Sequence, residues 1–135
     1  MDDIVLTFTA PADPVSMNDG DSWRTRSDTA AWRDRAYFAW CEQHPGRGPG
    51  SRSYGGPGEV HTALTFTLQR RRDPINFART VKHIVDGFVL AGAWPDDTID
   101  HVVQHVPILR VGNEPLVIVR VTPHVPHLDS MTDLT

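Results

Sequence analysis

The chain has 135 residues, 39% of them hydrophobic, and a formal net charge of −4, which fits one small globular domain with a single modest core. No apolar run approaches the roughly 20 residues that a membrane-spanning helix needs. The single cysteine, Cys41, excludes an intrachain disulfide and a cysteine-based zinc cluster. The acidic opening Met1-Asp2-Asp3 is not followed by a signal-peptide pattern, so we expect a cytoplasmic protein.

Positive and negative charges are unevenly distributed along the chain. Residues 22–82 carry eleven basic and five acidic residues, whereas residues 83–109 carry four aspartates and no lysine or arginine. A phosphate-binding surface beside a cation site would produce this pattern, because DNA needs positive charge and magnesium needs carboxylates. Ordinary solvated surface charge would produce it as well, so the charge pattern leaves both interpretations open.

The first half of the chain predicts a strand, a helix and a loop. Residues 4–9 are β-branched and aromatic and are followed by a proline, which favours a strand. Residues 29–43 contain good helix formers and stop before Pro45, which favours a helix. Residues 45–58 are rich in glycine and proline and predict a flexible loop that does not pack.

The second half predicts a strand, a helix and two further strands. Residues 60–69 alternate in the manner of a half-buried strand. A buried helical stripe follows, with a natural terminator at Gly92; its members are Phe77, Val81, Ile84, Val85 and Phe88. Residues 102–109 and 116–122 read as strands, and the turn signal at 112–113 predicts that they form a hairpin.

These elements define the predicted fold class. Their order is β-α-β-α-β-β, a single α+β domain with one mixed sheet packed by two helices. The domain is expected to span residues 1–123, and residues 124–135 are expected to form a frayed C-terminal tail.

Residues with phosphate and metal chemistry gather between positions 70 and 97. The helix carries Lys82 and Asp86 four residues apart on one face, and the loop after it delivers Asp96 and Asp97 together. Carboxylates at a strand end (Asp73) and in a later loop, flanking one helix, can converge on Mg²⁺, which prefers hard oxygen ligands and a substrate phosphate. Lys82 is the only lysine in a chain with twelve arginines, and a compact cation of tunable pKa suits a phosphoryl oxygen or a leaving group.

Each of these residues also has a purely structural explanation. Asp73 precedes a proline, and aspartate followed by proline is a common helix start with the aspartate as N-cap. Asn76 can cap the helix instead and leave Asp73 free for a cation. The Pro-Asp-Asp sequence that contains Asp96 and Asp97 is also ordinary turn chemistry, and a single lysine can be an incidental residue on a solvated face.

The run RRRDPIN, followed by TVKHIVDGFVLAGAWPDD, resembles the core of the RusA family of phage and prophage Holliday junction resolvases. That core reads as arginines, an Asp, an Asn, a Lys, an Asp, an Ala-Gly near the helix end and a terminal Asp-Asp. The segment from Pro14 to Asn18 and the pair Trp32-Arg33 are similar to the family's proline-rich, Ser-Asn opening and its aromatic-Arg helix. The similarity is strong from Arg70 to Asp97 and weak from Pro45 to Gly58.

The resemblance implies a metal-dependent endonuclease that resolves four-way DNA junctions as a homodimer, with Mg²⁺, or alternatively Mn²⁺, as cofactor. It implies that Asp73 and Asp97 bind the metal, that Lys82 is the essential lysine, and that Asp96 is a flanking acid. Asp86 matches a helix acid and is a further candidate ligand. The DNA contacts are then expected from Arg70, Arg71, Arg72, Arg79, Asn18, Arg33 and Asn76.

Two departures from the family pattern bear on the metal site. The family commonly has a second carboxylate two residues after the first, where this chain has Ile75. In addition, Asp73 and Lys82 are separated by three more residues than the family pattern predicts, which is roughly one helical turn. Either the site has one carboxylate fewer, or Asp86 or Asn76 replaces it.

Other functions remain in competition. A non-catalytic protein that binds branched DNA would keep the fold without the metal site, and a small interaction protein would use the acidic loop to bind another protein. His101 and His105 lie four apart in a strand pattern, which favours satisfied surface histidines over a zinc site. No motif supports a serine or cysteine nucleophile.

Overall fold

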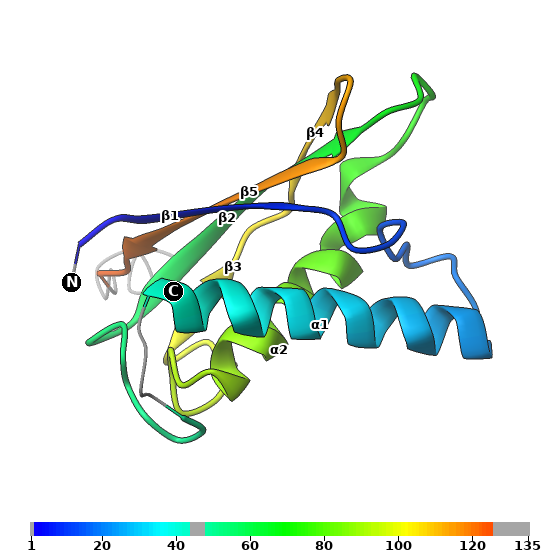
Figure 1. The fold of residues 1–135 in the computed structure, drawn as a ribbon. Coiled ribbons are helices and arrows are strands. Elements are labelled where there is room, and N and C mark those ends of the chain that lie inside the picture. Colours follow the sequence, from blue (N-terminus) through cyan, green and yellow to red (C-terminus); the bar gives the residue numbers. More distant parts are fainter. Residues whose placement is uncertain (1, 44–47, 126–135) are drawn as a thin grey trace, which may run out of the picture.

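The computed structural model describes residues 2–43 and 48–125. They form two layers, a mixed five-stranded sheet and two helices packed on one of its faces (Figure 1). The elements are β1 (Ile4–Thr9), α1 (Trp23–Gln43), β2 (Gly58–Phe66), the 3-10 helix η1 (Pro74–Phe77), α2 (Ala78–Leu90), β3 (Val102–Gln104), β4 (Ile108–Val111) and β5 (Leu116–Pro123). The predicted α+β domain with one mixed sheet and two helices is confirmed.

The central strand of the sheet is β2. It pairs in parallel with β3 and β4 on one edge and antiparallel with β5 on the other, and β5 also pairs antiparallel with β1. The predicted hairpin of residues 102–109 with 116–122 is therefore wrong, because β4 and β5 lie on opposite sides of β2. The physical reason is that β5 gains seven register pairs with β2 and six with β1, a far longer ladder than the four residues of β4 can offer.

The predicted strand 102–109 is two strands interrupted near Pro107. Each β3 residue is numbered 44 higher than the β2 residue it pairs with, and each β4 residue is numbered 45 higher. One extra residue is therefore inserted between β3 and β4, as in a β-bulge. A proline has no N–H to donate to the ladder, which favours the interruption at this point. The extra residue keeps Val102 and Leu109 on the core side of the sheet although seven positions separate them.

Helix α1 begins at Trp23, six residues before the predicted start at residue 29. The side chain of Ser22 accepts a hydrogen bond from Thr25 N at 3.2 Å, and its carbonyl accepts one from Arg26 N at 3.0 Å. These bonds satisfy amides of the first turn. The apolar pattern missed this turn because it is polar apart from Trp23, whose side chain is exposed.

The glycine-rich segment is packed over residues 48–57, which contradicts the prediction of a loop that does not pack; residues 45–47 lie outside the described residues. Tyr54 is buried, 5.7 Å from the ring of Trp94 and 6.3 Å from that of Trp40. Trp40 Nε1 donates to Ser53 Oγ at 2.8 Å, and Trp94 Nε1 donates to the Gly56 carbonyl at 2.9 Å. Buried indoles need acceptors, and this segment supplies them.

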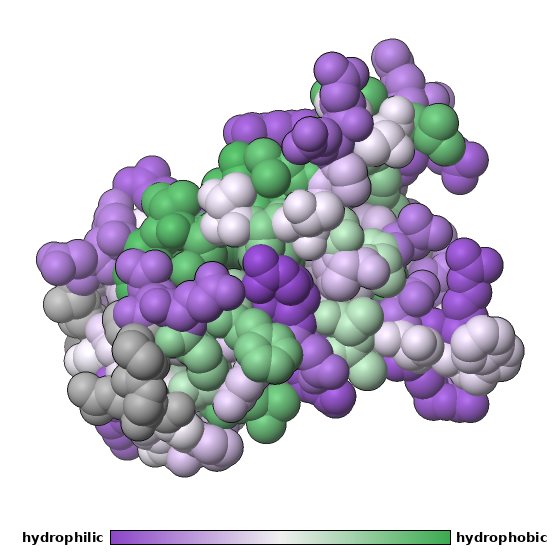
Figure 2. Space-filling view, viewed as in Figure 1, coloured by the Kyte–Doolittle hydropathy of each residue, from purple (hydrophilic) through white to green (hydrophobic). Residues whose placement is uncertain are grey.

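Strand β2 begins at Gly58 and ends at Phe66, whereas the alternation predicted residues 60–69. Beyond Phe66 the chain leaves the sheet and projects from it, beside the turn that joins β4 to β5 (Figure 1). Figure 2 shows hydrophilic side chains gathered on both projections. The arginine segment, residues 70–72, therefore lies outside the sheet, as do residues 67–69 of the predicted strand.

Helix α2 confirms four of the five residues of the predicted apolar stripe: Val81, Ile84, Val85 and Phe88 are buried in the core. The fifth, Phe77, lies in η1 and is only partly buried. The helix ends at Leu90, and Gly92 takes a positive φ of 93°, the conformation that favours glycine after a helix. Among the described residues, no helix is both long and apolar enough to cross a membrane.

Candidate functional site

The centre of the predicted site is Lys82 on α2, which joins two carboxylates. Its Nζ lies 2.5 Å from Asp97 Oδ2 and 3.3 Å from Asp86 Oδ1, one helical turn further along. All three side chains are partly open to solvent, at 55% exposure for Lys82 and 36% for each aspartate. The hydrogen bond to Asp97 raises the pKa of Lys82 despite its partial burial, so this side chain is a cation at neutral pH.

This cluster extends to α1 through a largely buried histidine. His83 Nδ1 lies 3.9 Å from Asp86 Oδ2, and its Nε2 lies 3.4 Å from Thr29 Oγ1 of α1. His83 and Lys82 together hold the pKa of the Asp86 carboxyl below its usual range. Asp86 is thus a carboxylate at neutral pH. Through His83 it connects the Lys82 cluster on α2 to Thr29 of α1.

Asp73 has the capping role that was weighed against metal binding. It is the N-cap of η1, and its Oδ1 accepts a hydrogen bond from Ile75 N at 3.2 Å. Ile75, which stands where the family has a carboxylate, is 53% exposed. Asn76 does not cap α2; Phe77 is the N-cap residue, without a side-chain hydrogen bond.

Asp96 is occupied by the turn that follows it. Its Oδ1 accepts hydrogen bonds from Thr98 Oγ1 at 2.6 Å and from Thr98 N at 2.9 Å, and these bonds lower the pKa of Asp96. Within the described ranges, the four predicted metal acids do not form a group of three or more with mutually close ligand atoms. Asp86 and Asp97 are the two that the fold brings to one point.

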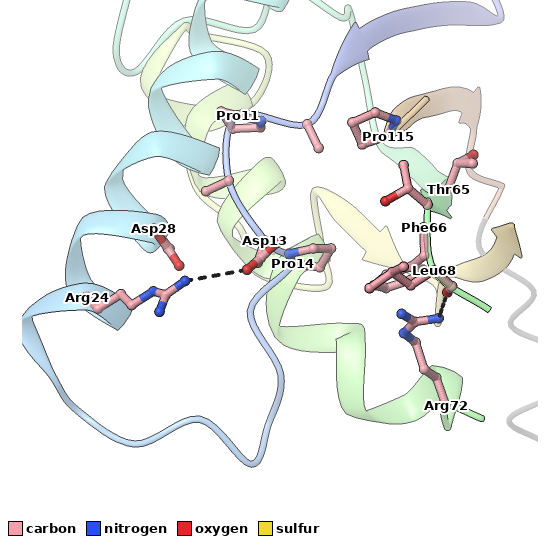
Figure 3. Close-up of a pocket in the computed structure, with 13 residues that line it drawn as sticks. Pro11, Asp13, Pro14, Arg24, Asp28, Thr65, Phe66, Leu68, Arg72 and Pro115 are labelled. Atoms are coloured by element: carbon pink, nitrogen blue, oxygen red, sulfur yellow. Dashed lines mark hydrogen bonds and ion pairs between the residues drawn. The ribbon is translucent and has the colours of Figure 1, made fainter. Parts of the chain in front are cut away.

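The arginine segment borders a hollow of about 420 Å³ (Figure 3). Arg24 and Asp28 of α1 line one side, and Phe66, Leu68 and Arg72 line the other. Arg72 stacks on the Phe66 ring, with its guanidinium carbon 3.8 Å from the ring centroid, and donates to the Leu68 carbonyl at 2.9 Å.

Arg72 also lines two smaller neighbouring hollows, one with Asp73 and one with Arg70. Arg70 and Arg71 are exposed. The guanidinium of Arg72, stacked on Phe66, thus borders three hollows and directly follows two exposed arginines in the chain.

The remaining predicted DNA contacts divide into two groups. Asn18 lies in a loop held against η1 and α2: Met17 N donates to the Asn76 carbonyl at 2.7 Å, and Arg79 Nη1 donates to the Asp19 carbonyl at 2.7 Å. Arg79 is therefore committed in part to positioning this loop. Arg33 lies on α1 and pairs with Asp34 at 3.5 Å.

Two carboxylates of the Lys82 cluster are of the type that Mg²⁺ takes, and both are ion-paired with Lys82. Mg²⁺ is typically held by one or two carboxylates, with water and substrate phosphate completing its shell. Asp86 and Asp97 offer two partly exposed carboxylates of this kind. Asp73 and Asp96 make local turn bonds instead.

A second cluster, on the opposite face of the sheet, was missed by the sequence analysis. Glu59, His61 and His105 each present one ligand atom, and these atoms all lie within 4.8 Å of one another. Sequence spacing paired His105 with His101, but His101 precedes β3 and lies 3.8 Å from Asp96. The sequence does show that Glu59 and His61 alternate along one strand. It does not show that this strand pairs with β3, which is what brings His105 beside them.

Neither a scan against protein-family models nor a search of curated proteins gives a match.

Proposed function

We propose that this protein is a metal-dependent endonuclease of the RusA type that nicks branched DNA. The observation that carries the proposal is the placement of Lys82 between Asp86 and Asp97 on an accessible surface, within the segment whose sequence resembles the family core. A cation and two carboxylates on one accessible surface suit a phosphodiester, which brings negative charge and needs a cation at the developing charge. Its place of action would be the cytoplasm of a bacterial or phage-infected cell.

In this mechanism Lys82 acts as a fixed positive charge. Because Asp97 raises its pKa, the ammonium keeps its proton and stabilises phosphoryl oxygens rather than serving as a base. Arg70 and Arg71 contact the DNA backbone. Arg72, stacked on the Phe66 ring, holds the neighbouring backbone of this segment in place. Asp86 and Asp97 would hold Mg²⁺ or Mn²⁺, and such an ion would supply charge neutralisation and water activation at the phosphodiester.

A homodimer belongs to the proposal because a four-way junction has near two-fold symmetry. Resolution needs two matched nicks, and an isologous dimer offers two identical sites. The loop that carries Asn18 lies against Asn76 and Arg79, so these residues would form one DNA contact region in each subunit.

A non-catalytic role in binding branched DNA is the second candidate, and a specific observation favours it. Ile75 replaces a carboxylate of the family pattern, and Asp73 is engaged as the cap of η1. A site reduced to Asp86 and Asp97 would hold metal less firmly than one with a third carboxylate. This candidate predicts junction binding without cleavage.

The test is incubation of the protein with a labelled four-way junction and a matched linear duplex, in Mg²⁺ and in EDTA. We expect Mg²⁺-dependent nicking of the junction. Asp97→Asn should abolish nicking and preserve binding, while the matched control Asp100→Asn, an exposed acid of the same loop, should cleave as the wild type does. Binding without any cleavage would overturn the endonuclease in favour of the second candidate, and absence of binding at low salt would overturn both.

A salt titration locates the DNA surface independently of cleavage. The logarithm of the binding constant should fall linearly with the logarithm of salt concentration. The slope should be about −0.9 for each DNA phosphate that the protein neutralises. Replacing Arg70 and Arg71 together by glutamine should flatten this slope by about 2. An unchanged slope would show that the arginine segment does not contact DNA.

A further inference from the structure

The outer face of the sheet, away from the helices, carries the second cluster. Glu59 and His61 are two residues apart on β2 and so point to the same side of the sheet. His61 lies directly opposite Arg120 of β5 and beside the end of β3. The extra residue between β3 and β4 occurs just beyond His105, where the chain would otherwise continue pairing with β2.

The three side chains already interact with one another. His105 Nε2 lies 2.7 Å from Glu59 Oε1, and the imidazole rings of His61 and His105 stack with centroids 4.3 Å apart. Their ligand atoms lie within 4.8 Å of one another, whereas ligands of a tetrahedral zinc ion are about 3.3 Å apart. Binding thus needs a small contraction and a turn of the rings out of their stack, which partly exposed side chains can make without disturbing the core.

We propose that Glu59, His61 and His105 form a binding site for a divalent transition-metal ion of the zinc class. Two imidazoles and one carboxylate are a known three-residue donor set for Zn²⁺, with the fourth position open to water or a small ligand. Imidazole nitrogen favours Zn²⁺, Ni²⁺ or Cu²⁺ over Mg²⁺, which takes oxygen ligands. Among the described residues this is the single group of three or more histidine, cysteine or acidic side chains whose ligand atoms approach so closely.

Two neighbouring features support the site. His124 Nδ1 lies 3.2 Å from Glu59 Oε2 and orients the carboxylate from the side away from His105, as an outer-shell partner of a metal ligand does. A groove of about 470 Å³ that His61 and His105 line, with Arg110 and Arg120, gives an ion access and leaves room for the open position. The site is separate from Lys82, Asp86 and Asp97 and does not depend on the proposed endonuclease.

The experiment is a titration of the tag-free, metal-stripped protein with Co²⁺, whose visible absorption reports tetrahedral coordination, followed by displacement with Zn²⁺. We expect one equivalent to bind at neutral pH, Zn²⁺ to displace it, and millimolar Mg²⁺ to leave the spectrum unchanged. Glu59→Gln and His105→Ala should remove the absorption, whereas the controls Glu114→Gln and His101→Ala should keep it.

His124→Ala tests the outer-shell role and should weaken Co²⁺ binding by about tenfold. Circular dichroism checks that each variant is folded, and Glu59→Gln, which keeps the side-chain shape, decides the matter if a histidine variant fails to fold. The proposal is overturned if the wild type gives no tetrahedral Co²⁺ spectrum. It is equally overturned if Glu59→Gln and His105→Ala bind Co²⁺ as tightly as the wild type.

Discussion

The close approach of the two helices at Gly87 makes Gly87→Ala the most direct test of the fold around the Lys82 cluster. A Cβ added at Gly87 would lie 2.2 Å from the Arg33 carbonyl oxygen and 2.8 Å from Ala36 Cβ, where ordinary contacts are 3.4–4 Å. Relief requires α1 and α2 to separate by at least about 1 Å, which weakens dispersion contacts across the interface. Trp40 and Phe88, with ring centroids 5.1 Å apart, pack between these helices.

Two opposing effects set the magnitude. Overpacking of this kind costs about 1–3 kcal/mol, and here the upper part of that range applies because the clash is with backbone. Alanine is a better helix former than glycine by about 1 kcal/mol, which offsets part of the loss. We therefore expect a net destabilisation of about 2 kcal/mol, or a Tm lowered by about 6–10 °C.

Urea denaturation followed by circular dichroism measures this change in the free energy of unfolding. The matched control is Gly20→Ala, because a Cβ at Gly20 meets nothing within 4 Å and should alter stability by less than about 0.5 kcal/mol. Stability of Gly87→Ala equal to or above that of the wild type would refute the close helix contact.

Two further predictions concern the carboxylates. Asp73→Ala should cost about 1 kcal/mol in urea denaturation, whereas Asp73→Asn should be nearly silent because asparagine caps as well as aspartate; equal stability of both variants would exclude the cap. The lowered pKa of Asp86 means that its ionised form stabilises the fold above about pH 4, and that this contribution disappears as the pH falls through the folded-state pKa. The stability difference between the wild type and Asp86→Asn should therefore shrink below about pH 4, and a difference independent of pH would contradict the interaction with Lys82 and His83.

The elements that could be predicted from the sequence are those with a strong local pattern. The stripe from Val81 to Phe88 determines α2 because a buried helix face leaves its period in the chain. The pairing of Lys82 with Asp86 followed from the same period. Asp97 was expected near this helix, and its hydrogen bond with Lys82 was not, because the path of residues 91–97 depends on tertiary contacts such as those of Trp94.

The errors share a different physical origin. The predicted hairpin was wrong because each strand pairs with whichever neighbouring strand offers the better ladder. The turn at residues 112–113 is compatible with either arrangement. The prediction of an unpacked loop around Tyr54 was wrong because composition alone does not reveal that the buried indoles of Trp40 and Trp94 need hydrogen-bond acceptors from this segment. The extra residue near Pro107 is a local feature, but its effect on His105 depends on a register with β2 that no spacing within the chain discloses.

The two proposed metal sites have different donor atoms and lie on different faces of the protein, so each can be tested independently of the other. Lys82 and Asp86 project from the side of α2 away from its buried stripe, whereas Glu59 and His61 alternate with the core residues of β2 and lie on the outer face of the sheet. Oxygen donors beside an ammonium favour Mg²⁺ bound together with a phosphate, and imidazoles favour a zinc-class ion bound without one. Asp97→Asn should accordingly leave the Co²⁺ spectrum intact, and Glu59→Gln should leave Mg²⁺-dependent nicking intact. A Co²⁺ spectrum lost in Asp97→Asn would mean that one ion site, not two, had been observed.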